Sequence, residues 1–112
     1  KLVENAATVG SYLHRKMQDA FGDDPHVGDI RGAGMLCAVE LVENRGDRAF
    51  YDPARKIGPQ VAAALLSSGV IGRAMPQSDI IGFAPPFCLT EAEADEIVAK
   101  TTQAVVEVIG VA

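Results

Sequence analysis

The chain has 112 residues, of which 48% are hydrophobic, a composition typical of one folded domain with a modest core. Its formal net charge is −5. An acidic surface offers no positive footprint for a phosphate backbone, so no nucleic-acid partner is predicted. Every apolar run is interrupted by glycine, proline or charge, so no membrane partner is predicted either.

The cysteines and histidines predict neither a disulfide nor a metal site. Cys37 and Cys88 lie in apolar stretches without CxxC spacing, and we interpret both as small core residues of a cytoplasmic, reducing compartment. His14 and His26 are isolated and lack partners at ligand spacing, which indicates surface or structural roles. The chain begins with Lys1 rather than Met, which we interpret as a cut within a longer polypeptide.

The first predicted element is a helix over about residues 3–21. One face carries small or apolar residues at three- and four-residue steps: Val3, Ala6, Gly10, Leu13, Met17 and Phe21. Gly22 follows as the expected C-terminal glycine, and residues 23–25 break the pattern. This face packs either on its own domain or on a missing one, and the pattern alone leaves both open.

Strands and a second helix are predicted for the middle of the chain. A strand is expected over about residues 35–42, preceded by a bend or a close backbone approach at Gly32 and Gly34. The pair Asp52 and Pro53 suits a helix start, but Pro59 favours a continuous helix that begins only near that residue. The next expected elements are a helix end at 67–69 and strands at 70–74 and 80–84, joined by a turn.

The clearest local signal opens the last predicted helix. Thr90 and Glu93 match a capping box, in which each side chain accepts a hydrogen bond from the other residue's backbone N–H. One helical face then follows: Ile97, Val98, Thr101, Val105, Val108 and Ile109. The order helix, strand, helix, two strands, helix predicts an α+β domain, with helices packed on a small, mostly antiparallel sheet.

Two arginines are the candidate functional residues, because the chain has no generic catalytic motif. Arg73 lies within the apolar strand pattern at 70–75, where a guanidinium must be paired, solvated or bound to a ligand. Its planar fork suits a carboxylate. The residues alone favour a solvated or ion-paired Arg73 over a ligand-binding one. Arg31, next to Gly32, is likewise interpreted as a solvated or ion-paired arginine.

Three runs together resemble the C-terminal part of class III aminotransferases. They are residues 27–36, residues 69–75, and residues 79–90 with the acidic amphipathic helix that follows. The resemblance covers essentially the whole chain in order and spacing. Members of that family often carry an aliphatic residue after the paired prolines, where this chain has Phe87.

The resemblance implies that residues 1–112 form the small C-terminal domain of a fold-type I pyridoxal-phosphate (PLP) enzyme without its large PLP-binding domain. In such an enzyme PLP forms a Schiff base with a lysine of the large domain. The lysines of this chain match no such position: Lys1, Lys16, Lys56 and Lys100. No catalytic or cofactor-binding residue is therefore expected here, and the chain alone is expected to be inactive. A homodimer with an amino donor and a keto acid as substrates is implied for the full-length enzyme.

The resemblance also gives Arg73 a role. In amine:pyruvate members, an arginine at the matching position binds the substrate carboxylate and moves aside for substrates without one. Ornithine-type members carry a different arginine, where this chain has Gly82. The resemblance thus favours an ω-amine or ω-amino acid:pyruvate aminotransferase. The alternatives are a 4-aminobutyrate:2-oxoglutarate aminotransferase, an aminomutase, or a non-catalytic α+β binding module.

Overall fold

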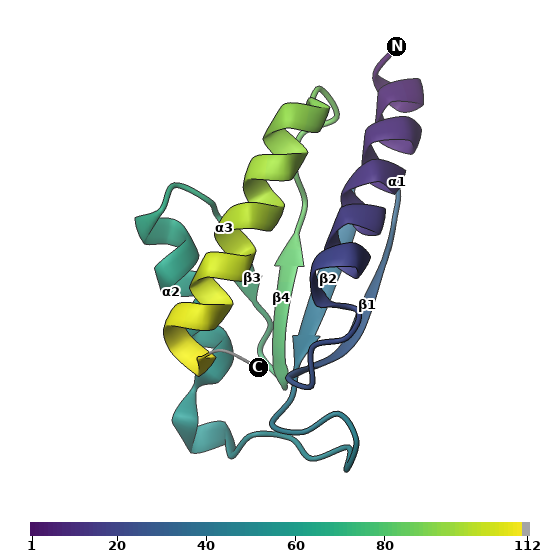
Figure 1. The fold of residues 1–112 in the computed structure, drawn as a ribbon. Helices are drawn as coiled ribbons and strands as arrows, with labels where there is room; N and C mark the ends of the chain where they lie inside the picture. The colour runs from purple at the N-terminus through teal and green to yellow at the C-terminus, as the bar shows by residue number, and fades with distance from the viewer. Residues whose placement is uncertain (111–112) are drawn as a thin grey trace.

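The computed structural model describes residues 1–110 and confirms the α+β architecture, with three α-helices and one four-stranded antiparallel sheet in that part of the chain (Figure 1). The strand order is β1-β2-β4-β3. The elements are α1 (Leu2–Phe21), β1 (Val27–Ala33), β2 (Leu36–Leu41), a 3-10 helix (Pro53–Arg55), α2 (Ile57–Ser67), β3 (Arg73–Ala74), β4 (Asp79–Phe83) and α3 (Glu91–Ile109).

All three helices cover one face of the sheet (Figure 1). Helix α1 packs on β1 and β2, helix α2 packs on β3 and β4, and α3 lies between the other two helices. The helix-facing side chains of the central strands are buried: Cys37, Val39, Leu41, Ile81 and Phe83. Within the described residues, no helix is both long enough and apolar enough to cross a membrane.

The predicted face of α1 packs on the chain's own domain, which decides between the two alternatives left open. Its buried residues are Ala6, Val9, Gly10, Leu13, Met17 and Phe21. Val3 was expected on this face, but it is 77% exposed because it lies on the first turn, beyond the edge of the core. Gly22 does end the helix, but in a right-handed conformation (φ −57°) rather than the left-handed one that favours glycine.

Strand β1 was not predicted, because residues 27–33 hold few apolar side chains. Only Val27 is buried and Ile30 half-buried in this edge strand, so its alternation is too weak to read from sequence. It forms a hairpin with β2 through a turn at Gly34, which has a positive φ of 56°. The predicted close approach is confirmed at Gly32, where a Cβ atom would collide with the carbonyl oxygen of Leu36.

Helix α2 begins at Ile57, two residues before the predicted start near Pro59. Proline is tolerated there because it lies in the first turn, where N–H groups have no partner within the helix. The predicted start at Asp52 marks a separate 3-10 helix, in which an Asp52 carboxylate oxygen accepts a hydrogen bond from the Ala54 N–H at 2.9 Å. In the first turn of α2, the Gly58 N–H donates to Asp79 Oδ1 at 2.8 Å, and this hydrogen bond connects α2 to the start of β4.

Strand β3 is shorter than the predicted strand at 70–74, since only Arg73 and Ala74 pair with β4. The N–H of Val70 donates to Leu65 O at 2.9 Å, so this residue still completes the end of α2. The capping box of α3 is confirmed: Thr90 Oγ1 accepts from the Glu93 N–H at 3.1 Å, and Glu93 Oε1 accepts from the Thr90 N–H at 3.0 Å.

Cys37 is buried as predicted, whereas Cys88 is exposed, which corrects its assignment to the core. Cys88 lies in the loop after the paired prolines, where the chain leaves the sheet and has not yet entered α3. His26 has the structural role expected of it. Its ring nitrogen Nδ1 lies 3.0 Å from the carbonyl oxygen of Glu43 and 3.3 Å from the hydroxyl of Tyr51.

Candidate functional site

The face of the sheet opposite the helices carries the candidate site, and we call it the open face. Side chains alternate between the two faces along each strand, so the residues between the buried ones belong to the open face. On the central strands these are Leu36, Ala38, Glu40, Ile80 and Gly82. None of them is buried by the three helices.

One row of residues crosses all four strands on the open face. The strand register pairs Arg31 with Ala38, Ala38 with Gly82, and Gly82 with Arg73. Neighbouring strands lie about 4.8 Å apart, so the two arginine Cα atoms are separated by roughly 14 Å. Because the two central residues have the smallest side chains, a groove of about 670 Å³ lies over them and includes both arginines in its lining.

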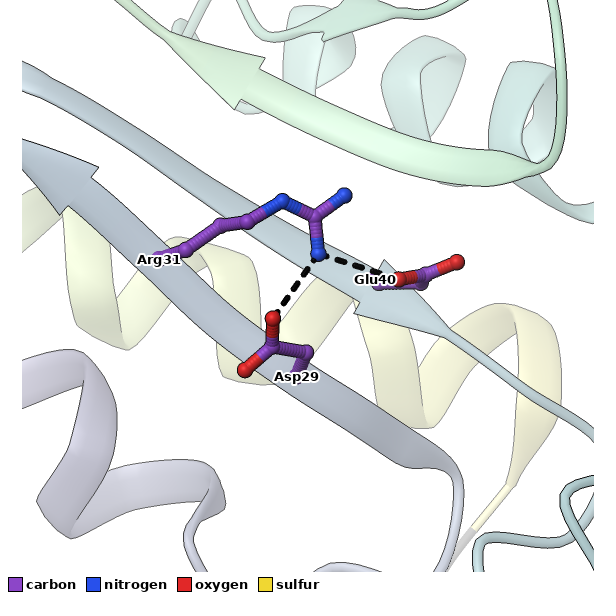
Figure 2. Close-up of polar contacts among 3 residues, drawn as sticks. All are labelled: Asp29, Arg31 and Glu40. Carbon is purple, nitrogen blue, oxygen red and sulfur yellow. Dashed lines mark hydrogen bonds and ion pairs between the residues drawn. The ribbon is translucent and has the colours of Figure 1, made fainter.

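Arg31 is held at one end of this groove by two carboxylates (Figure 2). Its Nη1 donates to Asp29 Oδ2 at 3.0 Å and to Glu40 Oε1 at 3.0 Å. These hydrogen bonds, the one to Glu40 first, raise the pKa of the Arg31 guanidinium above its usual value. The three groups together carry a formal charge of −1. The structural interpretation of Arg31 is therefore confirmed.

Arg73 lies at the other end of the row, on edge strand β3, and is exposed. Among residues 1–110 its side chain makes no hydrogen bond or ion pair. Of the two structural interpretations of Arg73, the described residues support the solvated one and provide no carboxylate partner. An unpaired guanidinium beside a groove can bind a carboxylate with two parallel hydrogen bonds. Its role toward a substrate stays a prediction.

Met75 lines the same groove, and sequence reasoning missed it. It lies two residues after Arg73, so its side chain belongs to the same face of the sheet. Its Cε atom occupies the space where a side chain at Gly82 would begin. A signal for this contact was present in the sequence, because a glycine within a strand often marks a close approach by another group.

The open face does not by itself fit PLP, because no lysine lines the groove among the described residues. Lys100 pairs with Glu96 at 2.7 Å within α3, and Lys16 lies 5.5 Å from the Tyr12 ring on α1, both in the helix layer. Lys56 lines a separate hollow beside Tyr51 and Asp79. The groove thus offers a cation for a carboxylate, but no amine that could form a Schiff base.

A family model described as aminotransferase class III matches residues 1–105, nearly the whole chain. The chain belongs to the class III aminotransferase family. Among curated class III relatives, it is 50% identical over 104 residues to a diaminobutyrate–2-oxoglutarate transaminase of Halomonas elongata. That match covers 93% of this chain and 22% of the relative.

Solved transaminase structures share the fold. A transaminase obtained by ancestral reconstruction superposes with a TM-score of 0.93 at 52% identity, and the match covers 96% of this chain and 23% of that one. The ω-transaminase of Pseudomonas jessenii, solved as a thermostable six-fold mutant, gives a TM-score of 0.87 at 38% identity, with the same coverage. The chain thus spans under a quarter of the length of these class III proteins.

Proposed function

We propose that residues 1–112 are the small C-terminal domain of a PLP-dependent aminotransferase that moves an amino group from an ω-amine or ω-amino acid to pyruvate. The observation that carries this proposal is Arg73, which has no carboxylate partner among residues 1–110 and lies at the end of a groove whose other arginine is already neutralised by carboxylates. Family membership and the likeness to ω-transaminase structures support it.

In this proposal Arg73 binds the carboxylate of the keto acid or of an amino-acid donor. Its place on a short edge strand supports the role, because a side chain there has solvent on one side and is free to change rotamer. It would turn away when an amine without a carboxylate binds. Desolvation of the pair by substrate and protein would strengthen the ion pair relative to an exposed one.

PLP and its lysine would belong to a large domain that precedes this segment in the full-length enzyme. When bound, PLP acts as the electron sink for amino-group transfer. The isolated segment would then have no aminotransferase activity. A cytoplasmic homodimer is part of the same proposal: the family resemblance supports the homodimer, and the absence of CxxC spacing in the sequence supports a reducing compartment.

A 2-oxoglutarate acceptor is the second candidate, because the Halomonas elongata relative is a 2-oxoglutarate transaminase. A dicarboxylate has two charged ends, and a second guanidinium in the groove would strengthen binding of the second end. The second guanidinium of the groove is Arg31, which is already committed to Asp29 and Glu40. At the open face, this pairing favours a monocarboxylate acceptor such as pyruvate.

The test begins with the visible absorption spectrum of the full-length protein with PLP added. An absorption band of bound PLP that fades with an amine donor, and returns with pyruvate faster than with 2-oxoglutarate, is the expected result. The 112-residue segment alone is the matched control and should show no such band. If the full-length protein binds PLP but transfers no amino group to any keto acid, the proposed activity is wrong.

A further inference from the structure

Arg73 and Gly82 lie directly opposite each other on neighbouring antiparallel strands. The Cα atoms of such a pair are about 4.5–5.5 Å apart, and both side chains leave the sheet on the same face. A side chain at position 82 would therefore leave the sheet next to the Arg73 side chain. By strand geometry alone, a cation could reach the same part of the groove from either strand.

Met75 is the obstacle at position 82. A Cβ atom built on Gly82 would overlap the Met75 Cε atom, whereas the nearest backbone atom, Arg73 O, would be 3.9 Å away. The space above Gly82 is therefore closed by the end of one flexible side chain and not by the backbone. The backbone of Met75, the residue after β3, is held beside β4 because its N–H donates to Ile80 O at 2.9 Å.

We propose that Met75 is a specificity-determining residue: by covering Gly82, it restricts the carboxylate-binding cation of the groove to position 73. It also keeps the floor between Gly82 and Ala38 apolar, so that the hydrocarbon part of a substrate can lie beside Arg73. This inference rests on the proposed function, in which Arg73 binds a substrate carboxylate. In this proposal Met75 and Gly82 together determine that the carboxylate-binding cation comes from Arg73.

The test relocates the guanidinium in the full-length holoenzyme. Four variants are compared: R73A, R73A/G82R, R73A/G82R/M75A, and the cation-free control R73A/M75A. Each is assayed in a single-turnover half-reaction with an ω-amino acid and with a matched amine that lacks the carboxylate. The readout is the second-order rate constant for the ω-amino acid divided by that for the amine. A general loss of activity affects both rate constants and cancels in this ratio.

The proposal expects R73A to lower this ratio and R73A/G82R to leave it low. Removal of the methionine in R73A/G82R/M75A should raise it about tenfold or more, as a regained charged hydrogen bond would. The control R73A/M75A should stay low. If the triple variant shows no recovery, or R73A/G82R recovers as well as the triple variant does, the assignment of Met75 is overturned while the role of Arg73 stands.

If R73A does not lower the ratio, the proposed role of Arg73 is wrong and this inference is overturned with it. Melting temperatures provide a second measurement in case the arginine variants do not fold. Gly82→Ala should lower the melting temperature in the presence of Met75, and should have little effect in the Met75→Ala background. Equal effects in both backgrounds would show that Met75 does not fill the space above Gly82, which also overturns the inference.

Discussion

The two faces of the sheet are built from the same strands but differ in almost every property. The face under the helices presents buried apolar side chains, such as Val39 and Ile81, against which α1 and α2 pack, and α3 packs on those two helices. The open face presents charged, small and half-buried groups and a groove. Strand alternation thus allows one sheet to bury a core on one side and to present a groove on the other.

The open face itself has two unlike ends. At the β1 end the guanidinium of Arg31 is fixed by Asp29 and Glu40, whereas at the β3 end Arg73 has no partner among the described residues. The same side chain in the same row is a structural element at one end and a candidate ligand-binding group at the other. The difference comes from the carboxylates around each arginine rather than from the arginine itself.

The largest difference between the two faces is expected in the loss of unfolding free energy when an apolar side chain is shortened. Ile81 is 1% exposed, so Ile81→Ala should lower the free energy of unfolding by about 2–5 kcal/mol, through lost burial and a residual cavity. Leu36 is 64% exposed on the open face, and Leu36→Ala should change it by less than about 0.5 kcal/mol. Urea unfolding of both variants measures the difference. Comparable losses would mean that the open face is covered as tightly as the other.

The two cysteines should differ in thiol reactivity, because one is buried and the other is exposed. Burial raises the pKa of the Cys37 thiol from 9.0 to about 11, so at pH 8 its thiolate fraction is about a hundredfold lower than in the unfolded chain. A disulfide reagent should therefore react quickly with exposed Cys88 and slowly with Cys37. Cys88→Ser should remove the fast phase, and Cys37→Ser should keep it. A fast phase that survives Cys88→Ser and is lost in Cys37→Ser would contradict the burial of Cys37.

The same raised pKa fixes the sign of a pH effect on stability. Because the folded state holds the Cys37 proton more tightly than the unfolded state, the free energy of unfolding is at its full value below pH 9 and falls as the pH rises toward 11. Cys37→Ala should reduce this slope, which unfolding measured across that pH range would show. An unchanged slope would mean that other groups cause it.

The smallest difference in the free energy of unfolding is expected between Arg31→Ala and Arg73→Ala. Arg31 is 46% exposed, so loss of its ion pairs in Arg31→Ala should lower the free energy of unfolding by only about 0.2–1 kcal/mol, and less at high salt. Arg73→Ala should change it by no more than about 0.5 kcal/mol, since Arg73 has no ion pair among residues 1–110 to lose. Unfolding at two salt concentrations provides the comparison. A larger, salt-sensitive loss for Arg73→Ala would show that Arg73 is the paired arginine.

Local signals predicted the helices well, because each depends on residues close together in sequence. The periodic face of α3 and the Thr90–Glu93 capping box are complete within one segment. Strand β1 was missed because its pairing depends on β2, and its own residues carry little apolar alternation. The shortened β3 has a similar origin, since the hydrogen bond of Val70 to the end of α2 is a matter of tertiary arrangement.

The candidate site was only partly readable from sequence for the same reason. Arg73 could be singled out as a charge within an apolar strand pattern, but the lack of a carboxylate partner among the described residues could be recognised only in three dimensions. The pairing of Arg31 combines Asp29, two residues away, with Glu40 on the next strand. The contact of Met75 with Gly82 depends on the register between β3 and β4, which no local pattern specifies.

The central claim, that the open face binds a substrate carboxylate through Arg73, is tested most directly by Arg73→Ala in the full-length enzyme. Single-turnover half-reactions with an ω-amino acid and with a simple amine avoid the keto-acid step, which always involves a carboxylate. Loss of a desolvated charged pair removes about 2–5 kcal/mol of binding, so the ω-amino acid should react at least roughly thirtyfold less efficiently while the simple amine is largely unaffected. Arg31→Ala is the matched control and should leave both donors close to wild type. Equal losses for the two donors in Arg73→Ala would contradict the claim.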